Sequence, residues 1–293
     1  MNSSRVIEIE QFAQALVKGA AMQLYLTPKP GLVDMANHGS HPDLSLAVME
    51  RSLHIVADYL AELVRSLADG ERFLCQAIIG RRAEAVMMDE LGTNTHKGYL
   101  FLSGLLLVAR WHSGTNDEQL LGKTVTHLAG QYFVDSDDQE TNGHSARLRY
   151  GTGGIVREAL DGLPSLFHCG VPSYLEALAR TGCFTTASFL VLARLMQTVE
   201  DTTTLHRGGA MGLARLRRDG QFLERVIDEG DDYRACLTEL NQEYVRMNLT
   251  MGGVGDMLGL TFGYLVAAGL LTGANERQRR GRHLTLSHCA TGN

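Results

Sequence analysis

Cysteine, proline and long apolar runs are all scarce in this chain of 293 residues. Its five cysteines form no Cys-x-x-Cys pair, which excludes a disulfide framework and the common zinc patterns and suits a reducing compartment. The longest apolar runs, 99–109 and 257–271, are shorter than the ~20 residues that a spanning helix needs. The N-terminus lacks a basic-then-apolar signal pattern. These absences favour a cytoplasmic protein that does not enter a membrane.

Positive charge is also lacking overall. The formal net charge of −6 gives no general attraction to nucleic acid or to an anionic membrane surface.

The length allows one large domain or two small ones, but no linker, low-complexity run or repeat divides the chain. We therefore predict a single catalytic domain over 1–275, followed by a basic, solvated tail over 276–293.

Strand signals are nearly absent, whereas helical periodicity is present throughout. Apolar residues spaced alternately by three and four form one stripe, made of Leu46, Met49, Leu53, Val56, Leu60, Leu63 and Leu67. This stripe predicts a helix over 44–68, with Asp43 as its N-cap after Pro42. Similar patterns predict helices over 6–25, 73–90, 97–111, 117–132, 145–162, 172–181, 184–199, 209–218, 221–229, 232–248 and 254–271. The expected fold is an all-α, single-domain multi-helix bundle.

Polar segments separate these helices, and they resemble one another in kind. Each combines Gly, Asn, Thr or Pro with ionisable side chains; they are 26–43, 92–98, 149–154, 200–209 and 249–256. Helix bundles place polar groups from several helix ends around one site. We therefore expect the polar inter-helix loops to form a central cleft.

Two of these segments carry cations suited to phosphate. Thr95 is placed to cap the helix that follows it, and Lys97 then lies in the first helical turn, where a cation is favourable if an anion also binds. Arg207 stands beside two glycines, so its guanidinium could donate two hydrogen bonds to a phosphate that approaches the backbone closely. One of the adjacent carboxylates, Glu200 or Asp201, could hold Mg²⁺ while the other caps a helix. The alternative for 92–98 is a polar loop with an exposed lysine. The alternative for 200–209 is a capped helix start with a surface ion pair.

The other segments give weaker signals. Asp34, His38, His41 and Asp43 lie within ten residues, which is a weak metal pattern, although lone histidines are more often packed or solvated. Segment 149–154 fails the dinucleotide fingerprint because Val156 stands where its third glycine should be and no strand precedes it. Asp256 is explained by the helix dipole alone. The sequence also lacks His-Glu-x-x-His, Gly-x-Ser-x-Gly and a His-Asp dipeptide, and Lys97-Gly98 is not a P-loop.

Taken in order, the polar segments resemble one family, the triphosphoribosyl-dephospho-CoA synthases, which make the prosthetic-group precursor of citrate lyase and malonate decarboxylase. The resemblance spans about residues 20–270. The matching residues are Leu26-Thr27-Pro28-Lys29-Pro30-Gly31-Leu32-Val33-Asp34, Asn37, Gly39, His41, Asp43, Asn94-Thr95-His96-Lys97-Gly98, Arg157-Glu158-Ala159, Gly162-Leu163-Pro164, Asp201-Thr202, Leu205-His206-Arg207-Gly208-Gly209, Gly252-Gly253 and Asp256.

The resemblance implies a reaction in which the 2′-hydroxyl of 3′-dephospho-CoA attacks C1 of the ATP ribose and adenine leaves. Such a reaction needs a carboxylate beside an oxocarbenium-like centre, a base for the hydroxyl, and cations with Mg²⁺ for the triphosphate. The expected catalytic residues are Asp34, His41, His96 and Asp201. The expected substrate-binding residues are Lys29, Asn37, Asn94, Lys97, His206, Arg207, Gly208, Gly252 and Gly253. The expected metal ligands are Asp34, Asp43 and Asp201.

The resemblance also implies that the product passes to a holo-acyl-carrier-protein synthase, and a homodimer is compatible with the sequence.

The chain departs from the family pattern in three places. Thr203 replaces an expected Asn, Thr250-Met251 and Val254-Gly255 alter the segment before Asp256, and 149–154 is altered. Two alternatives therefore stay open: a divergent enzyme that uses another nucleotide or acceptor, or water, and a non-catalytic nucleotide-binding helical protein.

Overall fold

The computed structural model describes residues 3–135 and 151–271, and every regular element in these ranges is helical, which confirms the all-α prediction. The elements are α1 (Ser3–Tyr25), α2 (Leu46–Ala68), α3 (Phe73–Leu91), α4 (Lys97–Ser113), α5 (Glu118–Asp135), α7 (Gly154–Leu160), a π-helical turn η1 (Ser165–Gly170), α8 (Val171–Thr181), α9 (Phe184–Thr198), α10 (Thr202–Glu229), α11 (Tyr233–Arg246) and α12 (Gly252–Ala267).

The centre of the molecule is the pair formed by α1 and α12, which pack closely along much of their length. Glycine makes this approach possible, since a Cβ on Gly19 would lie 2.2 Å from the backbone N of Gly263 and 2.3 Å from the O of Gly259. The apolar run in α12 is buried almost completely, so it is a core helix, as predicted.

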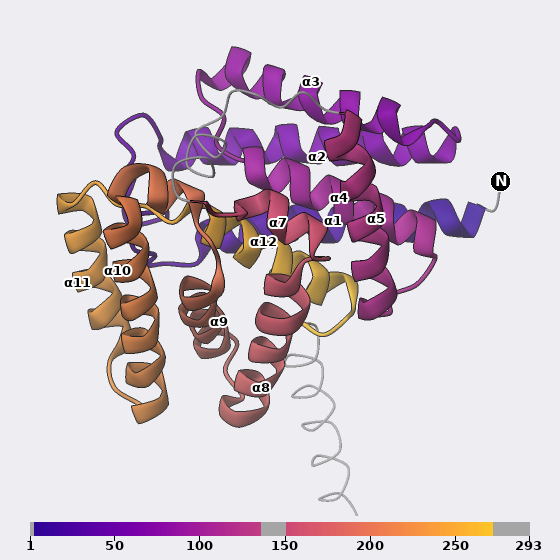
Figure 1. Ribbon diagram of the computed structural model, residues 1–293. Helices are drawn as coiled ribbons and strands as arrows, with labels where there is room; N and C mark the ends of the chain where they lie inside the picture. The colour runs from indigo at the N-terminus through magenta and orange to yellow at the C-terminus, as the bar shows by residue number, and fades with distance from the viewer. Residues whose placement is uncertain (1–2, 136–150, 272–293) are drawn as a thin grey trace, which may run out of the picture.

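The remaining helices cover this pair in two groups. In Figure 1, α2 and α3 lie across the top of the molecule beside α1, whereas α8 to α11 extend downward from it. The predicted stripe of α2 faces inward at Val56, Leu60, Leu63 and Leu67, which are all buried. Helix α4 packs against α1, α2, α3, α5 and α12, and this explains why its apolar run is buried on nearly all sides.

Three predictions about helix boundaries are wrong. The segments 209–218 and 221–229 belong to one helix, α10, which begins at Thr202 and contains a non-helical Gly209 with φ of 59°. Ser45 rather than Asp43 caps α2, because its side chain accepts from the N–H of Val48. The N-cap of α4 is His96 rather than Thr95, and it makes no capping side-chain bond.

Some predictions concern residues outside the described ranges. They include Arg149 and Tyr150, part of the helix expected over 145–162, and the basic tail 276–293. The single-domain boundary at 275 and the central cleft stay predictions. Within 3–135 and 151–271, no helix combines the length and apolar character that a membrane crossing requires.

Candidate active site

Polar segments that are far apart in the sequence meet at the ends of several helices. The α1–α2 loop contacts the start of α10 and the α11–α12 loop, and the start of α4 contacts the start of α12. Two groups can be distinguished. We call the α1–α2 loop with its partners Arg207, Asn241 and Thr250 the loop clamp, and we call residues 94–99 with Asp256 the α4 corner.

Lys29 is a buried structural cation of the loop clamp. Its side chain is fully buried, and its Nζ donates to the O of Leu24, 3.0 Å away, and to the O of Leu26, 2.5 Å away. These carbonyls lie at the C-terminus of α1, where a cation is favoured by the helix dipole. Burial lowers the pKa of Lys29 to about 7, although Asp34 opposes this shift. The predicted substrate-binding lysine therefore holds the end of α1.

Asp34 organises the backbone of the same loop. One carboxylate oxygen accepts from the N–H of Lys29 at 2.8 Å, and the other accepts from the N–H groups of Ala36 at 2.8 Å and Asn37 at 3.2 Å. Asp34 is buried, and a buried carboxylate with three backbone donors fixes a loop strongly. Its geometry is that of a loop-forming residue.

His41 forms a hydrogen-bonded chain across three segments. Arg207 Nη2 lies 3.2 Å from His41 Nδ1, and His41 Nε2 lies 2.9 Å from Thr250 Oγ1, which donates to the O of Gly31. Since Arg207 can only donate, Nδ1 accepts and Nε2 carries the proton. Burial, followed by the charge of Arg207, lowers the pKa of His41 to about 4. Both ring nitrogens of this neutral histidine are thus engaged.

Arg207 and Asn241 complete the loop clamp. Arg207 Nη1 donates to the O of Ser40 at 2.6 Å and to Asn248 Oδ1 at 3.0 Å, while Asn241 accepts from the N–H of Gly31 and donates to Asn37. Gly31 has φ of +70°, and a Cβ there would lie 2.3 Å from the O of Leu249. This close approach explains why glycine stands in the middle of the loop.

The α4 corner contains a buried histidine with one unpartnered nitrogen. His96 Nδ1 lies 2.7 Å from Ser52 Oγ, whose own proton goes to the O of Met49 at 2.6 Å. Nδ1 therefore donates, and Nε2 is left as a bare acceptor. Within the part of the chain that the structure describes, Nε2 is buried without a hydrogen-bond partner, as is Asn94 Oδ1. Burial lowers the pKa of His96 to about 4, so the ring is neutral.

Asp256 lies over the first turn of α4. A Cβ on Gly98 would lie 2.1 Å from Asp256 Oδ2, so the carboxylate occupies the space that glycine leaves against the helix start. Burial, followed by the nearby Asp201 carboxylate, raises the pKa of Asp256 well above its usual value, while the N–H of Tyr99 opposes the shift. This half-buried carboxylate brings together the starts of α4 and α12.

Asp201 joins the starts of α10 and α12. It caps α10, because one oxygen accepts from the N–H of Thr204 at 2.8 Å, and its other oxygen accepts from the N–H of Val254 at 2.9 Å. Burial raises its pKa, and these backbone donors oppose the shift. Gly253 leaves room for this carboxylate, since a Cβ there would lie 3.1 Å from Asp201 Oδ2.

The other predicted site residues lie around these two groups. Lys97 pairs with Glu84 at 2.9 Å and remains 45% exposed, so it can reach a ligand. His206 and Asp43 are exposed. A Cβ on Gly208 would lie 2.7 Å from Leu249 Cδ1, and one on Gly252 would lie 2.7 Å from Thr203 Oγ1.

The predicted metal ligands do not converge on one point. No group of three or more His, Cys, Asp or Glu side chains within the described parts of the chain is arranged to hold a metal ion. Sequence reasoning also missed Asp256 as a site residue, together with Ser52, Asn241 and Thr250. Only Asp256 carried a signal, since it belongs to the matched family pattern. The other three are ordinary helix or loop residues until the fold brings them to the site.

Comparison with known proteins gives a consistent result. A family model described as ATP:dephospho-CoA triphosphoribosyl transferase matches residues 9–275. The chain is 33% identical to an Azotobacter vinelandii protein over 86% of this chain and 89% of the relative, and 30% identical to a Pseudomonas putida protein over 85% and 91%. Both relatives are named "Probable 2-(5''-triphosphoribosyl)-3'-dephosphocoenzyme-A synthase".

A Pectobacterium atrosepticum protein with the same name, without the qualifier, is 29% identical over 85% of this chain and 86% of the relative. No solved structure matches the chain.

Proposed function

The chain belongs to the ATP:dephospho-CoA triphosphoribosyl transferase family, and we propose that it transfers the 5-triphosphoribosyl group of ATP to the 2′-hydroxyl of 3′-dephospho-CoA. The hydroxyl oxygen forms a bond to C1 of the ATP ribose, and the bond from C1 to adenine breaks. The hydroxyl proton passes to a base, adenine leaves with the bonding electrons and takes up a proton, and the triphosphate stays on the product. Family membership favours this transferase reaction over the alternatives raised by the altered loops.

His96 is our choice for the acid/base residue, in preference to His41. The observation that carries this choice is the unpartnered, buried Nε2 of His96, because an acceptor without a donor is ready to take a hydrogen bond from a hydroxyl or an amino group. Both nitrogens of His41 already have partners. His41 therefore serves the loop clamp, where it positions Arg207 and Thr250.

Asp256 is our choice for the carboxylate that faces the ribose. It lies at the same first turn of α4 as His96, whereas both oxygens of Asp34 and of Asp201 already accept backbone N–H groups. A carboxylate in a partly desolvated position stabilises positive charge at C1 more strongly than one in water. In this assignment Asp34 and Asp201 hold the backbone that presents the reacting groups.

The triphosphate is expected near the helix starts and the exposed amine of Lys97. The N-termini of α4, α10 and α12 favour anions, and Lys97 adds a full positive charge. The acidic residues fit a Mg²⁺ ion that arrives bound to the nucleotide. Such an ion takes most of its ligands from phosphate and water and only one or two from protein carboxylates. Asp256 would be the carboxylate that holds this ion, and the ion would neutralise phosphate charge.

The biological setting follows from the reaction. The product is a prosthetic-group precursor, and a holo-acyl-carrier-protein synthase is the proposed next enzyme. We further propose that the protein acts in the cytoplasm, which the four free cysteines of the described residues support, and that it works as a homodimer.

Chromatography of free adenine tests the function. The enzyme should release adenine from ATP only when both 3′-dephospho-CoA and Mg²⁺ are present, with one adenine for each product molecule. Release without dephospho-CoA would make water the acceptor, and no release under the full conditions would reject the proposal. His96→Gln should reduce the rate by about 10²–10⁴-fold, the usual range for loss of an acid/base group, whereas His54→Gln, at an exposed position of α2, should retain most of it.

A further inference from the structure

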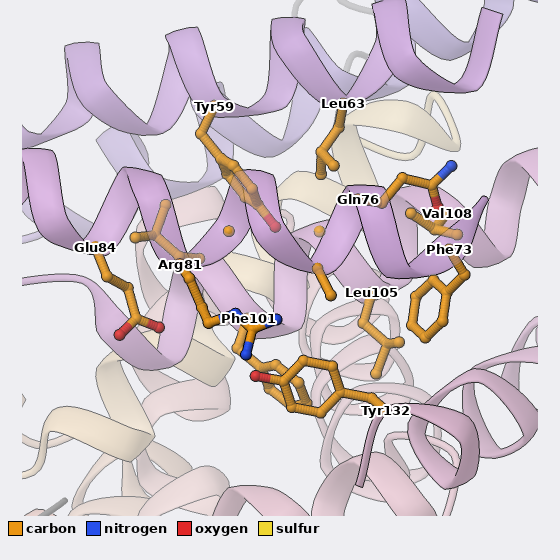
Figure 2. Close-up of a pocket in the computed structure, with 14 residues that line it drawn as sticks. Tyr59, Leu63, Phe73, Gln76, Arg81, Glu84, Phe101, Leu105, Val108 and Tyr132 are labelled. Carbon is orange, nitrogen blue, oxygen red and sulfur yellow. The ribbon is translucent and has the colours of Figure 1, made fainter. Parts of the chain in front are cut away.

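A narrow cavity lies between α3 and α4, beside the α4 corner. It has a volume of about 50 Å³ and is lined by apolar side chains of α2, α3 and α4, with Tyr132 of α5 at its edge. Figure 2 shows Glu84 and Arg81 at one end, Gln76 and Phe73 at the other, and the ring of Tyr59 reaching in between. None of these residues belongs to the reaction described above.

Glycines shape this cavity. A Cβ on Gly104 would lie 1.8 Å from the hydroxyl oxygen of Tyr59, and one on Gly80 would lie 3.6 Å from it. Gly104 thus makes room for the phenol of Tyr59 between α3 and α4, and any larger residue at 104 would displace the ring from the cavity. The phenol is held in its protonated form, because burial and the charge of Glu84 raise its pKa.

One buried acceptor in the cavity has no partner among the described residues. Gln76 is 3% exposed, and its Nε2 donates to the O of Glu71 at 3.3 Å, which fixes the amide. Its Oε1 is buried with no hydrogen-bond partner there. Buried acceptors are rarely left unpaired, so Gln76 Oε1 is suited to a donor from outside the protein.

One end of the cavity lies next to the candidate active site. Glu84, which lines one end, pairs with Lys97 in the first turn of α4 at 2.9 Å. The lining then follows α4 from Leu100 to Val108, a length of about 12 Å at the helical rise per residue. A molecule whose nucleotide lies at the α4 corner could therefore extend one thin chain into this space.

We propose that the cavity receives the thiol end of the pantetheine arm of the acceptor, 3′-dephospho-CoA. This inference rests on the proposed function, since it takes the acceptor from there. The arm is thin, largely apolar and carries secondary amide N–H donors, which match the apolar lining and Gln76 Oε1. A volume of about 50 Å³ exceeds the ~10–15 Å³ needed to hold one water, so the cavity has room for the last few atoms of a thin chain.

Calorimetric titration without ATP tests this site separately from catalysis. The probes are 3′-dephospho-CoA and 4′-phosphopantetheine, which is the arm without the nucleoside. Ala77→Leu fills the cavity from a half-buried position of α3, and Ala85→Leu makes the same change at an exposed position of the same helix. Ala77→Leu should weaken both probes about tenfold, as loss of one or two buried methylene groups predicts, whereas Ala85→Leu should change neither.

Gln76→Met provides a second variant that removes the acceptor without filling the space. It should weaken both probes several-fold, and thermal unfolding of each variant identifies any loss of folding. Wild-type affinity of Ala77→Leu and Gln76→Met for both probes would overturn the proposal. If the probes respond as expected but the wild type releases no adenine from ATP, the arm site stands and the proposed reaction fails.

Discussion

The loop clamp and the α4 corner differ in how completely their polar groups are paired. In the clamp, Lys29, Asp34, His41 and Arg207 are all bonded to other parts of the protein, and among the described residues of this group only Ser40 Oγ is buried and unpartnered. In the α4 corner, His96 Nε2 and Asn94 Oδ1 are buried without partners in the described ranges. Residues that match the same family pattern therefore divide into a fully bonded scaffold and a group with unpaired buried atoms, which is the group that we propose binds the substrates.

The largest expected effect is a loss of enzymatic activity at the α4 corner. Gly98→Ala would bring a Cβ to 2.1 Å from Asp256 Oδ2, so the carboxylate must move. A displacement of about 1 Å of a reacting group can lower the rate by ~100-fold, and we expect a loss of that size in adenine release. Gly130→Ala, in α5 with no atom near the added Cβ, is the control and should keep wild-type activity. Equal activity in both variants would remove Asp256 from the site.

In the loop clamp, the main effect should appear in stability. Asp34→Ala leaves three backbone N–H groups without an acceptor, which should lower the free energy of unfolding by about 2–4 kcal/mol. Urea denaturation measures this change, and Asp43→Ala, at an exposed position of the same loop, should change it by less than about 0.5 kcal/mol. If Asp34→Ala is stable but inactive, Asp34 is a reacting group and the division fails.

A smaller loss should follow at Thr250. Thr250→Val removes the hydroxyl that links His41 to the O of Gly31 and should destabilise the protein by about 2 kcal/mol. Thr250→Ser keeps the hydroxyl and should recover most of this loss in the same denaturation measurement. Failure of the serine variant to recover stability would mean that the methyl group, rather than the hydrogen-bonded chain, matters.

The smallest effect concerns the pH dependence of stability at Lys29. Because its pKa is about 7 in the folded protein and about 10.5 when unfolded, the unfolded chain binds an extra proton between these values. Stability should therefore rise with pH in this range, by about 1 kcal/mol from pH 7 to 8, and the penalty for burying the charge is fully present below pH 7. Lys29→Met should lose this contribution. An identical pH dependence in the two proteins would show that Lys29 keeps its charge.

The fold was predictable because helical periodicity is a local property. The stripe of α2 from Val56 to Leu67 faces the core, as its spacing in the sequence indicates. The break assigned at 200–209 was too long, because helical structure already begins at Thr202, and Gly209 then adds a non-helical kink within α10. A glycine marks a change of backbone direction, but the packing around it decides whether the helix continues.

The division within the site was less predictable. Asp34 and Asp256 are both aspartates in matched segments. The conformation of its own loop brings backbone N–H groups to both oxygens of Asp34, whereas a long-range contact places Asp256 against Gly98 at the start of α4. The same holds for His41 and His96, whose different roles depend on Arg207, Thr250 and Ser52 from distant segments.

The most direct test compares two matched substitutions, Asp256→Asn and Asp34→Asn, by the initial rate of dephospho-CoA-dependent adenine release from fully folded protein. Each change replaces a carboxyl group by an amide of the same size. The division predicts that Asp256→Asn is at least ~100-fold slower than the wild type, whereas Asp34→Asn stays within about tenfold of it. The reverse order, or equal rates for the two variants, would contradict the assignment of the reaction to the α4 corner.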